Sequence, residues 1–212
     1  MIISNLQPEF DTTWAELLKY DPVHPIDENK NLVRRFGSDR IIYTMTDQGK
    51  PGAMLQVALT SSAPMTAKSL WNKKEQTEPF LYAVFYSVFR LPDSDGVRGG
   101  VKELIFNAAE DLRVRFPSIG KFITLSPIPS LRTKFSKNPS IEQIQEFLVA
   151  KKDPVARFHI SNGALPWAVR RRADLSDLRK QESWGWMASY DYTPLVIKDV
   201  QSAVLDPILQ TL

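Results

Sequence analysis

Cysteine is absent from this 212-residue sequence, which excludes disulfides, thiolate metal sites and a cysteine nucleophile. Histidine is nearly absent: His24 and His159 are the two occurrences, so chemistry that needs an imidazole has two candidates. Charge of either sign is in little excess, because 27 Lys and Arg stand against 24 Asp and Glu, a net charge of +3. This balance is weak support for nucleic-acid binding, which usually shows as a clustered basic face.

Long apolar runs are also missing, and none is long enough to span a bilayer. The N-terminal residues lack the basic region and apolar stretch of a signal peptide. The C-terminal Gln210-Thr211-Leu212 is not a peroxisomal address. We therefore expect a cytoplasmic protein without a membrane or nucleic-acid partner. At 43% hydrophobic residues the chain suffices for one sizeable core and is marginal for two, which favours a single domain.

Hydrophobic periodicity predicts a chain of mixed α/β character. Two strands joined by a glycine- and proline-containing turn resemble a hairpin, and residues 80–91 have the aromatic and valine content of a central strand buried on both faces. The predicted strands are 40–46, 54–60, 80–91, 120–126 and 184–192, and the predicted helices are 8–20, 28–36, 101–116, 140–150 and 196–209.

The stretch 122–129 reads as the end of a buried strand with Ser126 directly after it. Pro127 and Pro129 fix φ, lack an N–H and bias the preceding residue away from helix. Neither a strand ladder nor a helix is therefore expected to continue directly after Ser126, and its hydroxyl is held at the strand end. Taken alone, the stretch is better explained as a structural turn, because serine is common in turns.

A glycine-rich segment lies between the predicted central strand and the helix 101–116. Gly96, Gly99 and Gly100 stand at the helix N-terminus, where free N–H groups and the helix dipole favour an anion such as phosphate. The segment matches neither the dinucleotide fingerprint nor the P-loop, so a plain connector explains it equally well. His159 is interpreted as lying on an apolar strand, where a histidine is more often structural than catalytic.

Six segments, in order from about residue 20 to 193, resemble the catalytic domain of malonyl-CoA decarboxylases. Those around Ser126 and His159 are long and specific. The segments are 23–25 (VHP), 57–60 (VALT), 85–87 (FYS), 124–129 (TLSPIP), 153–164 (DPVARFHISNGA) and 187–192 (MASYDY).

The resemblance implies a GNAT-like α/β (α+β) fold: one domain over residues 1–212, with a mixed sheet flanked by helices and 1–38 as N-terminal helices packed on it. It implies decarboxylation of a malonyl or methylmalonyl thioester to an acetyl or propionyl thioester. The family's active-site serine, histidine and tyrosine fall on Ser126, His159 and Tyr192. In acyl-CoA-dependent transferase-type folds the loop after the central strand holds the pyrophosphate of coenzyme A. The residues expected to bind the phosphates of coenzyme A or phosphopantetheine are Gly96, Val97, Arg98, Gly99 and Gly100.

The implied chemistry suits these residue types. Loss of CO2 leaves a thioester enolate, whose oxygen needs preorganised hydrogen-bond donors and whose carbon then needs an acid. Ser126 and His159 would bind and polarise the substrate, His159 would serve the proton transfer, and Tyr192 would be a supporting donor. The thioester itself accepts the electrons, so no metal and no organic cofactor is required.

The sequence departs from the family in three respects. We expect a short form without the family's helical N-terminal domain, the segment between serine and histidine is shorter, and the family's acidic residue in the glycine-rich loop is missing. Glu103 is a poor substitute for that acid, whereas Arg98 adds a positive charge that suits a phosphate or carboxylate. A short form could serve an acyl carrier protein in a polyketide or similar pathway. Arg170, Arg171 and Arg172 beside Lys180 could contact such an acidic partner, although a solvated basic face explains them better.

Two other classes of function stay open. One is an acyltransferase that passes the acyl group from coenzyme A or a carrier protein to an amine or hydroxyl, because fold does not decide function. The other is a coenzyme A-binding protein with reduced catalysis. We expect a monomer or a small homo-oligomer.

Overall fold

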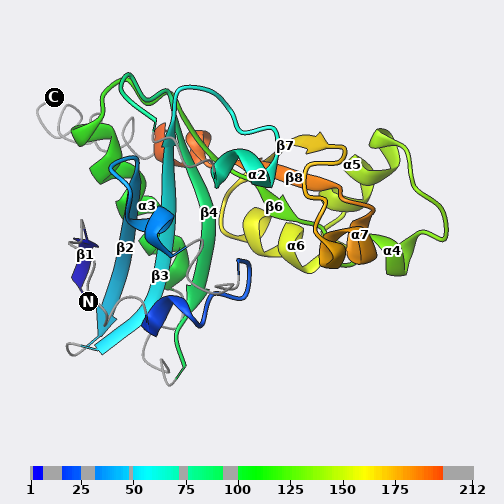
Figure 1. Ribbon diagram of the computed structural model, residues 1–212, viewed down its shortest axis with the longest axis horizontal. Helices are drawn as coiled ribbons and strands as arrows, with labels where there is room; N and C mark the ends of the chain where they lie inside the picture. Colours follow the sequence, from blue (N-terminus) through cyan, green and yellow to red (C-terminus); the bar gives the residue numbers. More distant parts are fainter. Residues whose placement is uncertain are drawn as a thin grey trace, which may run out of the picture.

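The computed structural model describes residues 2–6, 16–24, 32–47, 50–71, 76–92 and 100–197. These residues build a sheet of eight strands in the order β1-β2-β3-β4-β5-β8-β6, with β7 beside β8 (Figure 1). The strands are β1 (Ile2–Leu6), β2 (Arg40–Asp47), β3 (Lys50–Thr60), β4 (Tyr82–Arg90), β5 (Lys121–Thr124), β6 (Ser126–Pro127), β7 (Leu165–Arg170) and β8 (Met187–Asp191). The helices are η1 (Val33–Phe36, a 3-10 helix), α2 (Ala67–Leu70), α3 (Gly100–Arg115), α4 (Leu131–Lys134), α5 (Ile141–Val149), α6 (Pro154–Ser161) and α7 (Asp177–Ser183).

The short strand β1 and the long strands β2, β3 and β4 form one antiparallel half of the sheet, as Figure 1 shows. The expected hairpin is confirmed as β2 and β3, and the expected central strand is confirmed as β4. Seven consecutive residues of β3, from Ala53 to Leu59, are fully buried. Both faces of this strand are therefore covered by other parts of the chain.

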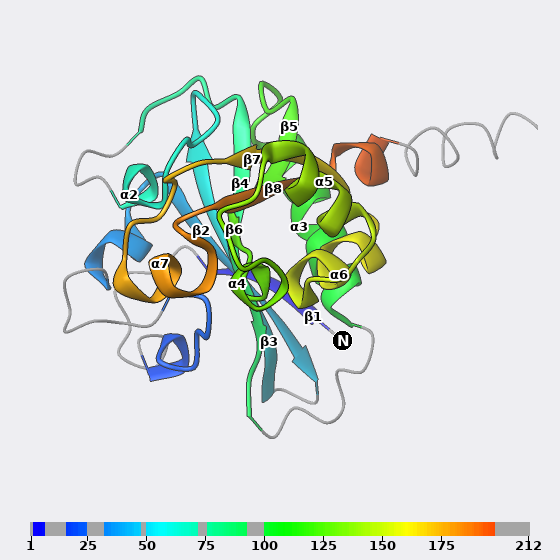
Figure 2. The same cartoon turned by 90° about the vertical axis from the view of Figure 1, so that its right-hand side faces the viewer.

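Helix α3 contacts β1, β2, β3 and β4 and covers one face of this half. It confirms the predicted helix 101–116, and its buried residues follow the helical period. They are Gly100, Val101, Leu104, Ile105, Ala108, Ala109 and Leu112. The small helices α4 to α7 gather around β6, β7 and β8 in the other half of the molecule (Figures 1 and 2). The expected fold class, a mixed sheet flanked by helices, is therefore confirmed.

The two halves meet at β4 and β5, the parallel pair among the described strands. Their ladder runs from Tyr82 opposite Lys121 to Phe85 opposite Thr124 and then ends. The chain turns away at Leu125, and Ser126 pairs with Ala188 of β8 instead. The ladder to β4 has already ended before Ser126, and the expectation of no pairing directly after Ser126 is wrong: Pro127 pairs with β8, so β6 adds two residues to the sheet.

Other sequence-based expectations also differ from the structure. Within 1–38, expected to be helical, Ile2–Leu6 is a strand that pairs with β2, because its N–H and C=O groups complete the open edge of the hairpin. Strand β7 and helix α7 occupy stretches for which no element was predicted. His159 lies on a helix, not on a strand.

Of the predicted helix 8–20, residues 16–20 are described: 16–18 are helical and 19–20 form a turn. Of the predicted closing helix 196–209, residues 196–197 are described and end a helical stretch that begins at 193. The remaining residues of both predicted helices lie outside the described ranges. In the part of the chain that the structure describes, no helix combines the length and apolar character needed to cross a membrane.

Candidate active site

A pocket of about 230 Å³ opens where β4 and β5 part. The backbone ladder ends at Phe85 and Thr124, so the space beyond this point is lined by side chains. We call this pocket the chamber. Its lining residues are Val23, Phe85, Tyr86, Ser87, Val88, Ser126, Pro127, Pro154, Val155, Phe158 and His159. Among these described lining residues none carries a formal charge when His159 is neutral.

Helix α6 places His159 in the chamber. Asp153 caps its N-terminus by accepting hydrogen bonds from the backbone N–H of Val155 (2.9 Å) and Ala156 (3.1 Å), and Pro154 occupies the first turn. This Asp-Pro start signal explains why the segment is a helix although its apolar residues suggested a strand. After the helix, Gly163 has φ +96°, a left-handed conformation that favours glycine and returns the chain to β7.

Ser126, His159 and Tyr192 form one hydrogen-bonded row. Nε2 of His159 lies 3.0 Å from Oγ of Ser126, and Nδ1 lies 2.9 Å from the hydroxyl of Tyr192. All three side chains are buried, with Tyr192 fully inaccessible. The structure thus brings together the three residues that the resemblance singled out, from β6, from α6 and from the residue after β8.

Proton positions in the row follow from the available partners. The Tyr192 hydroxyl has His159 Nδ1 as its hydrogen-bond partner among the described residues, so the phenol donates to Nδ1. The imidazole then carries its own proton on Nε2 and donates it to Ser126 Oγ. Ser126 donates in turn to Thr124 Oγ1 (2.9 Å). The serine proton is therefore the one that can be redirected to a ligand.

Burial sets the charge of this row. Desolvation lowers the pKa of His159 to about 3, so its imidazole is neutral near pH 7. Burial also raises the pKa of the Tyr192 phenol, which stays protonated. The ring of Tyr190 stacks on His159 with centroids 4.6 Å apart and holds the imidazole plane. The row is a chain of neutral donors.

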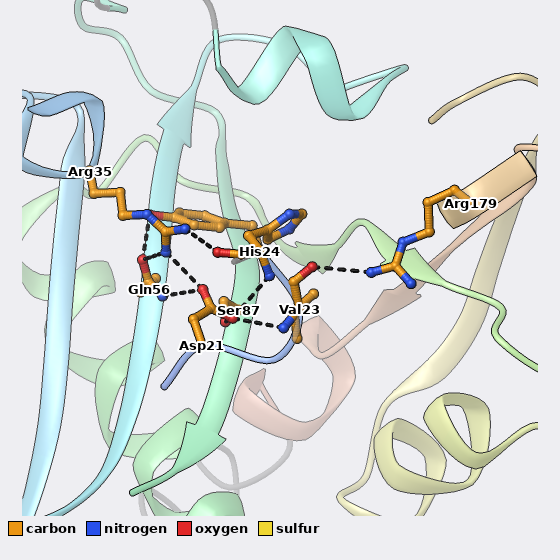
Figure 3. Close-up of polar contacts among 8 residues, drawn as sticks. Asp21, Val23, His24, Arg35, Gln56, Ser87 and Arg179 are labelled. Atoms are coloured by element: carbon orange, nitrogen blue, oxygen red, sulfur yellow. Dashed lines mark hydrogen bonds and ion pairs between the residues drawn. The ribbon is translucent and has the colours of Figure 1, made fainter. Parts of the chain in front are cut away.

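The opposite wall of the chamber is backed by a charged network (Figure 3). Asp21 forms a fully buried ion pair with Arg35 at 2.7 Å, and Gln56 Nε2 donates to the same carboxylate oxygen at 2.8 Å. The second oxygen accepts from Ser87 Oγ at 2.8 Å. Burial raises the pKa of Asp21, but the charge and hydrogen bond of Arg35 outweigh it, so the net pKa is lowered.

A second, larger pocket of about 570 Å³ lies on the far side of Val23 and His24. Both pockets share Val23, whose carbonyl accepts a hydrogen bond from Arg179 at 3.1 Å (Figure 3). Burial lowers the pKa of His24 to about 4, and its Nε2 is buried with no hydrogen-bond partner among the described residues. Lys68 and Arg172 also line this pocket.

Of the phosphate-binding candidates, Gly96, Val97, Arg98 and Gly99 lie outside the described residues, and Gly100 is the buried first residue of α3. Glu103 is exposed on the first turn of α3 and does not line the chamber. Within the described ranges, no group of three or more His, Asp or Glu side chains could hold a metal ion.

Sequence reasoning missed two contributors to the site. Thr124 accepts the Ser126 proton and also a hydrogen bond from the Tyr190 N–H at 3.1 Å. Asp21 reaches the chamber through Ser87, which is 66 positions away. A signal existed for Asp21, since an aspartate before Pro22 commonly binds backbone N–H groups two and three residues on. Here it accepts from Val23 and His24.

Comparisons with known proteins first define the class of fold. A GNAT-like decarboxylase, GphF, solved in complex with isobutyryl-CoA, superposes with a TM-score of 0.64. It is 14% identical, over 90% of this chain and 98% of that one. The fold is therefore GNAT-like.

The family follows from the sequence comparison. The model of the malonyl-CoA decarboxylase C-terminal domain matches residues 11–152, and the chain belongs to this family. The mitochondrial malonyl-CoA decarboxylase of Mus musculus is 25% identical over 81% of this chain and 49% of that protein. A malonyl-CoA decarboxylase structure from Agrobacterium vitis gives 25% identity and a TM-score of 0.74 over 90% of this chain and 60% of that chain. The chain thus spans about half the length of its curated relatives.

Proposed function

We propose that this protein decarboxylates a malonyl or methylmalonyl thioester, releasing CO2 and an acetyl or propionyl thioester. The observation that supports this most is the neutral row of Ser126, His159 and Tyr192 at the wall of an uncharged chamber. Family membership supports the same reaction class.

The chamber suits the movement of charge in this reaction. A substrate carboxylate meets no charged side chain among the described lining residues. As CO2 leaves, the negative charge moves to the thioester oxygen of the forming enolate. Hydrogen-bond donors aimed at that oxygen, with no counterion for the departing carboxylate, stabilise the transition state more than the ground state.

Each side chain of the row has a role in the proposal. Ser126 redirects its proton from Thr124 to the thioester oxygen. His159 gives its Nε2 proton to the enolate carbon, while the Tyr192 hydroxyl keeps its hydrogen bond to Nδ1. Solvent restores that proton, so one proton enters for each CO2 released. A thioester enolate carbon is basic enough to take a proton from a neutral donor.

The substrate arm carries phosphates in coenzyme A and in phosphopantetheine. We assign them to the segment from Gly96 to Gly100 as predicted, because Gly100 begins α3 and the positive end of the helix dipole lies there. The thioester then reaches the chamber between β4 and β6.

A carrier protein is the finer substrate hypothesis. Arg171 and Arg172 are exposed after β7, and Lys180 is exposed on α7, so an acidic partner could contact them. Comparing malonyl-CoA with a malonyl carrier protein tests this. We expect Arg171→Glu to raise KM for the carrier protein and to leave KM for malonyl-CoA unchanged.

One observation favours the alternative of an acyltransferase: the pocket of about 570 Å³ beyond Val23 has room for an acyl acceptor. Incubation with malonyl-CoA separates the functions. Release of CO2 with acetyl-CoA supports decarboxylation, and free coenzyme A with an acylated acceptor supports acyl transfer. Binding without turnover would indicate a coenzyme A-binding protein instead.

A further inference from the structure

We propose that Asp21 is a positioning residue that makes Ser87 a hydrogen-bond acceptor toward the chamber, where Ser87 binds an amide N–H of the substrate's pantetheine arm. This rests on the proposed function, because it concerns the arm of the same thioester. It assigns to the buried Asp21 network a part in orienting the substrate.

Ser87 lies on β4, beyond the point where the ladder to β5 ends, and lines the chamber together with Ser126. Its hydroxyl donates to Asp21 Oδ1 at 2.8 Å (Figure 3), and both residues are 3% exposed. A serine hydroxyl has one proton. Once that proton is committed to Asp21, Ser87 offers only lone pairs to a ligand.

Asp21 keeps accepting the hydrogen bond of Ser87, because donors on both oxygens hold its carboxylate in the ionised form. Oδ2 accepts from Arg35 and Gln56, and Oδ1 accepts from the backbone N–H of Val23 (2.8 Å) and His24 (3.1 Å) as well as from Ser87. The lowered pKa of Asp21 agrees with this arrangement. The fold therefore fixes the direction of the Ser87 hydrogen bond: its O–H points to Asp21.

The chemistry of the substrate then decides what Ser87 binds. A malonyl thioester presents only acceptor oxygens at its acyl end, whereas the pantetheine arm carries amide N–H donors. Acceptor oxygens are disfavoured beside the lone pairs of Ser87 and the negative charge of Asp21. The oxygens of the acyl end therefore accept hydrogen bonds from Ser126 and His159, and an amide N–H of the pantetheine arm donates to Ser87. The two walls thus fix which way the substrate lies.

The chain provides a matched control in Asp39. This buried carboxylate also accepts from an arginine of η1, Arg34, at 2.5 Å and 2.6 Å, and from the backbone N–H of Gln76 at 2.8 Å. It does not line the chamber. Asp39→Asn therefore removes a similar buried charge without touching Ser87.

The experiment measures the Kd of acetyl-CoA by titration calorimetry and kcat and KM for malonyl-CoA. In Ser87→Ala we expect Kd and KM to rise about five- to tenfold, the loss of one hydrogen bond. We expect kcat to change less than about threefold, because ground and transition states share the arm contact. Asp21→Asn frees the Ser87 proton and should produce the same rise, whereas Asp39→Asn should leave Kd unchanged.

A double-mutant cycle gives the sharpest test. If Asp21 acts through Ser87, the double variant Asp21→Asn/Ser87→Ala binds acetyl-CoA no more weakly than Ser87→Ala alone. Additive effects would overturn the positioning role. An unchanged Kd in Ser87→Ala would overturn the whole proposal, and this variant decides the question if Asp21→Asn does not fold.

Failure of this inference is distinguishable from failure of the proposed function. Calorimetry with acetyl-CoA needs no turnover. A wild-type protein that releases no CO2 but loses affinity in Ser87→Ala contradicts the function and supports the inference. Normal CO2 release by the wild type, together with a Kd that Ser87→Ala does not change, supports the function and contradicts the inference.

Discussion

The two walls of the chamber are both polar and buried, but they are built in opposite ways. The wall of Ser126, His159 and Tyr192 consists of neutral groups joined by hydrogen bonds. The wall of Ser87 is backed by the Asp21–Arg35 ion pair, whose carboxylate accepts the hydrogen bond of the Ser87 hydroxyl. The comparison teaches that burial alone does not decide the charge of a polar wall: one wall is neutral and the other is backed by an ion pair, although both are buried.

The largest effect is expected when the ion pair behind the charged wall is disrupted. Arg35→Met leaves Asp21 as a buried carboxylate without its ion-pair partner, and we expect a loss of about 3–5 kcal/mol in the free energy of unfolding. Urea denaturation measures it. Arg113→Met, which removes a half-exposed pair with Glu110, should cost less than about 1 kcal/mol. Equal losses in the two variants would show that the Asp21 network does not differ from a surface pair.

The second effect is expected when a hydrogen-bond donor is removed from the neutral wall. Ser126→Ala removes the donor assigned to the enolate oxygen, and we expect the decarboxylation rate to fall about a hundred- to thousandfold. Release of CO2 from malonyl-CoA measures it, with circular dichroism as the check on folding. Unlike Arg35→Met, this variant should unfold at nearly the wild-type urea concentration. A rate within about threefold of wild type would contradict the assignment of Ser126.

The third effect uses pH to test whether His159 in the neutral wall is held uncharged. Folding lowers the pKa of His159 from 6.5 to about 3, so the unfolded chain binds more protons between these values and stability falls as pH drops below 6.5. At pH 5 the loss amounts to about 2 kcal/mol from this residue. Urea unfolding of wild type and His159→Gln at pH 7 and pH 5 isolates it, since His24 titrates in both. The same pH dependence in both proteins would show that His159 is not held neutral.

The smallest effect sharpens the order of donors within the row. Tyr192→Phe removes the hydrogen bond to Nδ1 and lets the imidazole proton move away from Ser126. We expect kcat to fall about tenfold, near the net worth of one hydrogen bond, with KM unchanged. Steady-state kinetics with malonyl-CoA measures both values. A rise in KM with unchanged kcat would place Tyr192 in substrate binding instead.

Local sequence signals predicted much of the fold, because they act within one element. Alternation and β-branched content indicated β2, β3 and β4, and helical spacing indicated α3. The capping box of Ser140 and Gln143 begins α5 where the sequence placed a helix start at Ser140. The prediction of a strand at His159 was wrong, because it gave more weight to the apolar neighbours of His159 than to the helix start signal of Asp153-Pro154.

The sequence by itself determined that an imidazole site could use only His24 or His159, and that the chain does not turn directly into a helix at Ser126, because Pro127 follows it. Family resemblance added Tyr192. Only the tertiary structure decided that Ser126 faces His159, that burial keeps this histidine neutral, and that Asp21 reaches Ser87. These contacts join residues 33 and 66 positions apart, and local propensity carries no information about such distances. Burial, which fixes their charges, exists only once the chain is packed.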